Sequence, residues 1–405
     1  MKKDFSNHLS RRKVLFTAKK KISLALMFSI SKPLFAFEKL SKIVLKKNTK
    51  DNKNSSFNAV GFGRKPSYNY NRPQPELIFH TSEIVLITNQ QKYYSIKVSF
   101  LPHSIIQNLK KPNIVTIVPK WGHKAVEYNL FTKKITSTCE LEKYSLFFGH
   151  GFYNPDGNSI YLSEHSESTS ESYISQWKLD TSTAKRIKNI RTGGLRVHDC
   201  QLSLDGKYII AANSSFSQDS KIKPSLAWID IKTNKIETQL YFETFGPTHF
   251  YQTTDGYFIY GGGASLPGSE KLEAILGVVT PEKKIVPLKV PQEMKAFFYG
   301  EALSLIANEP NNIAYASLPS SDSVFAFNYL TGKFIKRLNI KAAQGLSLSD
   351  DRSILMVSSV ENYSELYKFN SVSFEQLPMT ITPKKLNEYE YNWGSHIFKL
   401  KYLEI

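Results

Sequence analysis

Short segments that alternate apolar and polar residues fill most of the chain, and long stretches with a helical repeat are nearly absent. Each unit starts at a Pro-Asp-Gly-like turn and continues through short strands that are rich in aliphatic and aromatic residues. The turn recurs 49 and 50 residues apart, at Asp156-Gly157, Asp205-Gly206 and Asp255-Gly256. Alternation of this kind, closed by Asp, Asn and Gly turns, predicts antiparallel hairpins.

A repeat of about 40 to 55 residues with four short strands is typical of a propeller blade. Between Leu77 and Thr380 we count seven such units. The last segment, from Tyr391 to Ile405, supplies a strand that would close the ring onto the first unit and remove an open sheet edge. The sequence therefore predicts an all-β fold, a seven-bladed β-propeller over residues 76–405 that is closed by a C-terminal strand. Two stacked β-sandwiches are the alternative.

The N-terminus has the pattern of a targeting segment. Arg11-Arg12 precedes an apolar run from Ile22 to Ile30, and Ala36 offers a cleavage point. This pattern predicts a twin-arginine export signal over residues 1–36 and a periplasmic protein. The run is too short to span a bilayer, so we expect no transmembrane span. The alternative is an uncleaved basic anchor that tethers the protein to the membrane.

The polar segment that follows, residues 37–75, is rich in Asn, Lys, Ser and Pro and predicts a flexible lead-in. It also changes the meaning of the net charge, which is +18 for the whole chain. Residues 1–36 carry +8 of this charge and residues 37–54 another +4, which leaves +6 for the rest. So small an excess over some 350 residues does not indicate a nucleic-acid partner.

Few other motifs suggest chemistry. The two cysteines, Cys139 and Cys200, form neither a disulfide framework nor a zinc finger, and two buried thiols or one bridge both remain open. The chain has no Gly-x-Ser-x-Gly elbow, no phosphate-binding Gly loop and no HExxH helix.

Histidines are placed regularly within the repeat. His150, His198 and His249 precede the Asp of the turn by six, seven and six residues. The strand that enters this turn is the innermost of a blade, so the three imidazoles should meet at one end of a central funnel, where His103 and His396 could join them. Converging imidazoles can bind a transition metal such as iron or copper, a haem propionate or an anion, or transfer protons. The alternative is that each histidine bonds to a neighbouring blade.

Three acidic residues are candidates for orienting these histidines. Asp199, beside His198, could fix the orientation of its ring or could cap a turn. Glu164 could lie near the same rim or in a solvated loop. Glu301 occupies an equivalent inner position in a later unit.

These residues carry a family resemblance. The chain resembles the bacterial, commonly twin-arginine-exported proteins catalogued as domain of unknown function 1513. The features that it shares run from Pro102 to the C-terminus and include Phe148-Gly149-His150-Gly151, His198-Asp199, Pro224-Ser225-Leu226, Tyr299-Gly300, Trp393 and His396. The resemblance implies a periplasmic propeller that accompanies iron-uptake and imelysin-like proteins, but it implies no established reaction.

Three functions remain open. The first is a monomeric, non-catalytic binding module whose histidine-lined funnel takes a metal or docks a metal-handling protein. The second is a metal-dependent hydrolase or oxidoreductase that uses the same funnel. The third is an interaction scaffold whose histidines are structural. Few inward carboxylates are evident, which favours binding over catalysis.

Overall fold

The structure is a computed structural model. It describes residues 59–64, 82–87, 93–100, 102–167, 171–215, 222–243, 246–265, 272–359, 366–378 and 392–400. The predicted export signal, residues 1–36, lies outside these ranges. Within them the secondary structure is almost entirely antiparallel β-sheet, with three short 3-10 helices, η3 (Gln292–Phe297), η4 (Glu309–Asn311) and η5 (Pro319–Ser321).

Three of the sheets each contain four strands in chain order. The first is β15 (His249–Gln252), β16 (Phe258–Ser265), β17 (Leu272–Val279) and β18 (Ile285–Pro287). The second is β19 (Leu305–Asn308), β20 (Ile313–Leu318), β21 (Ser323–Asn328) and β22 (Lys333–Asn339). The third is β23 (Ala343–Leu348), β24 (Ile354–Ser359), β25 (Leu366–Asn370) and β26 (Gln376–Leu377).

A fourth sheet joins the two ends of the described chain in the order β27-β1-β2-β3. Its strands are β27 (Asn392–Lys399), β1 (Ala59–Arg64), β2 (Ser82–Ile87) and β3 (Tyr93–Val98). Strand β27 falls in the segment predicted to supply a closing strand, and it pairs antiparallel with β1. Strand β1 lies inside the segment for which the sequence predicted a flexible lead-in, so regular structure begins before Leu77.

The remaining strands form one continuous sheet of eleven. They are β4 (Pro102–Gln107), β5 (Ile114–Gly122), β6 (Lys124–Asn129), β7 (Lys134–Glu140), β8 (Ser145–Tyr153), β9 (Ser159–Ser166), β10 (Glu171–Lys178), β11 (Lys185–Leu202), β12 (Tyr208–Ser215), β13 (Ser225–Asp230) and β14 (Ile236–Tyr241). Two strands connect neighbouring parts of this sheet. Strand β5 pairs with β4 and β6 and then, from Lys120, with β8, while β11 pairs first with β10 and then with β12.

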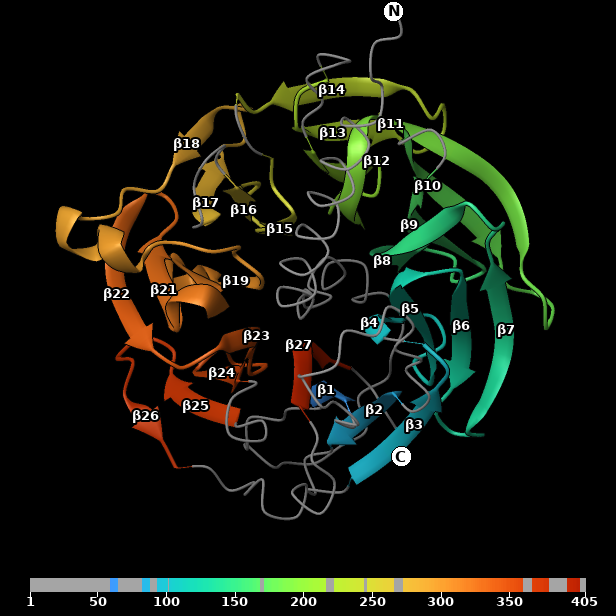
Figure 1. The fold of residues 1–405 in the computed structure, drawn as a ribbon, viewed down its shortest axis with the longest axis horizontal. Helices are drawn as coiled ribbons and strands as arrows, with labels where there is room; N and C mark the ends of the chain where they lie inside the picture. The colour runs from blue at the N-terminus through green and yellow to red at the C-terminus, as the bar shows by residue number, and fades with distance from the viewer. Residues whose placement is uncertain are drawn as a thin grey trace, which may run out of the picture.

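The sheets are arranged radially around a common centre, as Figure 1 shows. Strands β4, β8, β15, β19, β23 and β27 lie nearest the centre, and β7, β14, β18, β22 and β26 lie outermost. Burial decreases from the inner to the outer strands. Every residue of β4, β15 and β23 is buried, whereas nearly all residues of β14 and β22 are exposed or half-buried. The fold is therefore all-β and propeller-like, with apolar cores between neighbouring sheets.

The repeated Asp-Gly turns form as the sequence predicts. They connect β8 to β9, β11 to β12 and β15 to β16, and the glycine of each has a positive φ of 72 to 92°. The two cysteines are free and buried in separate apolar clusters, so the bridge that the sequence left open does not form.

Candidate functional site

Five histidines that are distant in sequence come together near the centre of the molecule. We call them the five-His cluster: His103 on β4, His150 on β8, His198 on β11, His249 on β15 and His396 on β27. Each lies on the first strand of its repeat or, for His396, on the closing strand. The structure thus brings together all five candidate ligands that the sequence singled out, including the two that lacked the common register.

The five rings are in mutual contact. Their centroids are separated by 4.7 Å between His198 and His249, 4.9 Å between His103 and His150, and 5.1 Å between His103 and His396. Most of the pairs meet edge to face. All five side chains are buried, with exposed fractions of at most 5%.

Close backbone approaches hold the rings in place. Gly149, at a φ of +103°, lies so near His103 that a Cβ there would meet the ring at 1.9 Å. Gly345 on β23 packs closely against the backbone at His396, since a Cβ added at Gly345 would lie 2.4 Å from the Ile397 nitrogen. Only glycine permits these contacts, so the cluster depends on two residues that carry no side chain.

Burial disfavours the charged form of three of these imidazoles. It is the main cause that lowers the pKa of His103, His198 and His396 well below its ordinary value, and the positive charge of Lys120 acts in the same direction. A neutral imidazole has a lone pair to offer a metal ion, whereas a protonated one does not.

Several ring nitrogens have no hydrogen-bond partner among the described residues. They are Nε2 of His103, Nε2 of His198 and both nitrogens of His396. An unpaired polar group in a protein interior costs roughly 1 to 3 kcal/mol. Simple structural histidines would be expected to have partners, so this arrangement points to a ligand that satisfies the nitrogens.

Two overlapping groups of three have the spacing of metal ligands. His103, His150 and His396 form one group, and His150, His198 and His249 form the other, each with ligand atoms within 4.8 Å of one another. A tetrahedral ion with bonds near 2.1 Å needs about 3.4 Å between nitrogens, so small ring movements would complete either set. Because both groups use His150, they would hold one ion rather than two.

Two of the three predicted acidic residues lie beside the cluster. The Asp199 carboxylate is 3.8 Å from Nδ1 of His150, on the inner strand β8 of the preceding repeat, rather than serving His198 as the sequence suggested. It accepts hydrogen bonds from the Phe250 backbone at 3.3 Å and from Gln201 at 3.2 Å. These contacts fix the carboxylate against the His150 ring.

Glu301 reaches the cluster through a residue that the sequence analysis did not single out. The Thr248 hydroxyl lies 2.8 Å from Nδ1 of His249 and also bonds to Glu301. Burial raises the pKa of Glu301, while Lys120 and Arg196 oppose this shift. The contact with Thr248 thus fixes the orientation of the His249 ring.

The third acidic residue, Glu164, forms an ion pair with Arg186 and not with a histidine of the cluster. It accepts a hydrogen bond from Arg186 at 2.7 Å, and that guanidinium also lies over Trp177. Of the other described histidines, His123 is exposed and bonds to the Ser145 carbonyl, and the ring of His165 lies 5.8 Å from Phe148.

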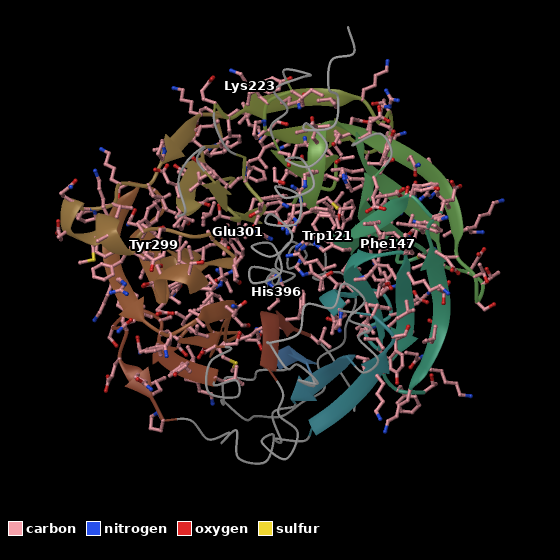
Figure 2. The ribbon with its side chains drawn as sticks, in the orientation of Figure 1. Trp121, Phe147, Lys223, Tyr299, Glu301 and His396 are labelled. Carbon is pink, nitrogen blue, oxygen red and sulfur yellow. The ribbon has the colours of Figure 1, made fainter. Side chains whose placement is uncertain are left out.

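A group of cations and aromatic rings adjoins the cluster, and of its members only Phe148 belongs to a motif noted in the sequence. We call it the cation–aromatic group: Lys120, Trp121, Phe148 and Arg196. The Phe148 ring lies 5.2 Å from His198 and 4.4 Å from Trp121. The Arg196 guanidinium lies over both aromatic rings, at 5.4 Å and 5.7 Å. In Figure 2, Trp121, Glu301 and His396 lie around the centre, and Lys223 and Tyr299 lie farther out.

Residues 97–399 match the family described as "Protein of unknown function (DUF1513)", so the chain belongs to that family. No curated protein matches the chain. The structure is similar to Kuenenia stuttgartiensis hydrazine synthase, with a TM-score of 0.57, 12% identity, and coverage of 71% of this chain and 89% of that one.

Two further solved structures share the architecture. The Cps50 (Swd1) β-propeller domain of Myceliophteria thermophila has a TM-score of 0.53 at 10% identity and covers 79% of this chain and 98% of its own. A chain of a mitotic checkpoint complex has a TM-score of 0.54 at 9% identity, with coverage of 84% and 86%. At these identities the similarity shows the fold alone.

The described residues contain no helix with the length and apolar character needed to cross a bilayer.

Proposed function

We propose that this protein is an exported, seven-bladed β-propeller that acts as a binding module and holds one transition-metal ion in the five-His cluster. The strand pairing supports seven blades. Division of the eleven-stranded sheet between β5 and β8, and within β11, gives three four-stranded groups beside the four separate sheets. The pairing of β27 with β1 supplies the closure that such a ring needs.

The observation that carries the metal proposal is the set of buried ring nitrogens without partners at His103, His198 and His396. Their neutral state, the ligand spacing and the fixed orientations of His150 and His249 add to it. An all-imidazole set suits copper, zinc, nickel or iron, and the Irving–Williams order places copper above iron. We therefore expect Cu²⁺ to bind more tightly than Fe²⁺.

The twin-arginine pattern supports export to the periplasm, where such a module could deliver metal to, or receive it from, a partner protein. The alternative of a metal-dependent hydrolase or oxidoreductase stays open as a prediction. The described metal-ligand groups consist of histidines alone, and the neighbouring carboxylates of Asp199 and Glu301 lie behind ring nitrogens. That arrangement favours holding an ion over activating a water molecule.

The test is a metal titration of the purified chain against a competing chelator, with elemental analysis of the protein as isolated. We expect one Cu²⁺ per chain. His150→Ala should weaken binding by about 100-fold or more, because both ligand groups lose a member. His123→Ala, an exposed histidine that is not in the cluster, is the matched control and should bind like the wild type. If no metal bound stoichiometrically, or if the two variants behaved alike, the proposal would be wrong.

A further inference from the structure

The cation–aromatic group contains two residues in unusual backbone conformations. Among the described residues, ten that are not glycine have a positive φ. Eight of these lie in turns or connections, but Trp121 (φ 61°) lies within β5 and Arg196 (φ 52°) within β11. A left-handed conformation is strained for a large side chain, and such residues cluster at binding sites.

Both residues lie where one part of the eleven-stranded sheet passes to the next. Strand β5 moves to β8 at Lys120, and β11 moves from β10 to β12 around Arg196. The two irregularities bring a guanidinium over the Trp121 and Phe148 rings, one side chain away from His198. The backbone strain therefore places a cation and an aromatic wall beside the five-His cluster.

The two cations lack an anionic partner in direct contact. Neither the Lys120 ammonium nor the Arg196 guanidinium makes a hydrogen bond or an ion pair within 4.0 Å of any described residue. Lys120 is half-buried and Arg196 exposed, whereas the imidazoles are buried. The cations thus lie between solvent and the cluster. Burial lowers the pKa of Lys120, the charge of Arg196 acts in the same direction, and Glu301 opposes the shift.

Charge balance shows what the site lacks. Lys120 and Arg196 are opposed by Glu301 and Asp199, so a divalent ion among neutral imidazoles would leave an excess of about two positive charges. One or two anionic groups at the open position of the ion would reduce this excess. The planar guanidinium fork matches a carboxylate, and the Trp121–Phe148 wall suits the apolar part of an organic anion.

We propose that Lys120 and Arg196, with the Trp121–Phe148 wall, bind a small organic carboxylate beside the five-His cluster, and that this carboxylate completes the coordination of the bound metal. The second half of this statement rests on the proposed function, and the first half does not. The protein would then take its metal as a carboxylate complex rather than as the hydrated ion.

The experiment titrates butyrate, and separately inorganic phosphate, into the metal-free and the Co²⁺-loaded chain by calorimetry, with the visible absorption of Co²⁺ as a second readout. We expect butyrate to bind more tightly than phosphate. Co²⁺ should strengthen butyrate binding about tenfold, butyrate should strengthen Co²⁺ binding by the same factor, and the Co²⁺ spectrum should change when butyrate binds.

Three variants localise the effect. Lys120→Gln and Arg196→Gln should each weaken butyrate binding about tenfold without weakening the binding of Co²⁺ alone. Arg191→Gln removes an exposed charge from the same strand, β11, and should have no effect. Wild-type butyrate affinity in both Lys120→Gln and Arg196→Gln would overturn the site, and tighter binding of phosphate would overturn the assignment to carboxylate.

The two proposals fail in distinguishable ways. If Co²⁺ does not bind, the proposed function is wrong, and the metal-free titrations with the same variants still decide the anion site. If Co²⁺ and butyrate both bind but neither the affinities nor the spectrum respond to each other, the anion site stands and its part in metal coordination is overturned.

Discussion

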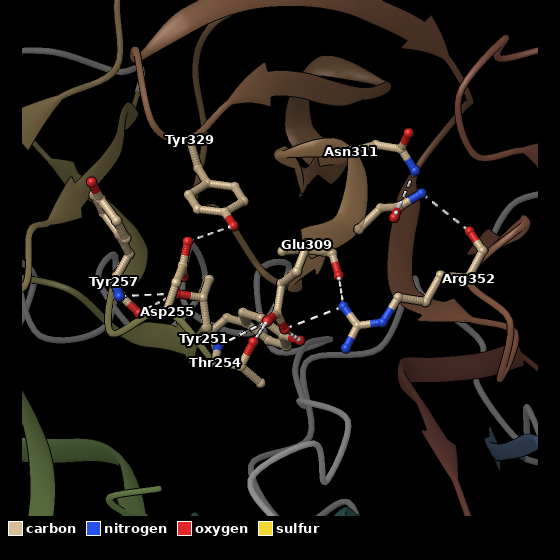
Figure 3. Close-up of polar contacts among 11 residues, drawn as sticks. Tyr251, Thr254, Asp255, Tyr257, Glu309, Asn311, Tyr329 and Arg352 are labelled. Carbon is tan, nitrogen blue, oxygen red and sulfur yellow. Dashed lines mark hydrogen bonds and ion pairs between the residues drawn. The ribbon is translucent and has the colours of Figure 1, made fainter. Parts of the chain in front are cut away.

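Two polar clusters of this protein differ in burial and in how their polar atoms are hydrogen-bonded. The first is the five-His cluster. The second, drawn in Figure 3, surrounds Glu309 at η4 and joins three neighbouring sheets. The Glu309 carboxylate accepts hydrogen bonds from the Tyr251 hydroxyl at 2.9 Å, from the Thr254 backbone at 2.8 Å and from Arg352 at 3.2 Å. The Thr254 hydroxyl bonds to it as well.

In the Glu309 cluster the carboxylate is paired with the Arg352 guanidinium and accepts several hydrogen bonds. Arg352 also donates to the Ala307 carbonyl at 2.9 Å, and Tyr329 donates to Asp255 at 3.1 Å. The five-His cluster is more deeply buried, yet it leaves ring nitrogens of His103, His198 and His396 without partners. The difference separates a clamp between sheets from the cluster that we propose as a metal site, since only the second leaves buried polar atoms without hydrogen bonds.

Disruption of the clamp should have the largest effect. Glu309→Ala leaves the buried Arg352 charge without its partner, so we expect the free energy of unfolding to fall by about 3 to 5 kcal/mol, as measured by urea denaturation. Metal affinity should not change. Glu243→Ala, which breaks an exposed pair with Lys223, is the control and should cost less than about 1 kcal/mol. Equal losses in the two variants would contradict the role of Glu309 as a clamp.

A change at Thr248 should affect metal binding without much loss of stability. Thr248→Val keeps the shape of the side chain but removes the hydroxyl that bonds to Nδ1 of His249. We expect metal affinity to fall about tenfold, as is typical when the partner of a metal ligand is lost. Thr248→Ser retains the hydroxyl and should restore the affinity. If valine and serine gave the same affinity, Thr248 would have no positioning role.

The smallest effect concerns pH. In the metal-free protein, burial lowers the pKa of His198 below the 6.5 of the unfolded chain. The unfolded state therefore takes up the proton first, so the stability present above pH 6.5 is lost as the pH falls below it. Between pH 7.5 and 5.5, urea denaturation should show the wild type losing about 1 kcal/mol more than His198→Asn. Identical pH profiles would show that burial does not keep His198 neutral.

The repeat explains why so much of the fold followed from the sequence. Asp-Gly turns require positive φ at glycine and mark hairpins locally, so Gly157, Gly206 and Gly256 predicted the first two strands of three units. The register of His150, His198 and His249 against these turns predicted that their rings would meet, because equivalent positions of a radial repeat lie at one level. Strand β1 was missed, since its neighbours in sequence are polar and one of its two pairing partners, β27, is more than 300 residues away.

The tertiary structure decided what no local pattern encodes. It paired Asp199 with His150 and Glu164 with Arg186. Each of these contacts joins two different strands, and no fixed spacing in the sequence predicts which residues of two strands will meet. It also placed Lys120 and Arg196 together beside the cluster, through irregular backbone at Trp121 and Arg196 where β5 and β11 pass between parts of the sheet. The sequence by itself thus determined the all-β repeat and the candidate imidazoles, because both follow from local periodicity. Which charges and hydroxyls surround those imidazoles depended on packing between strands that are distant in the chain.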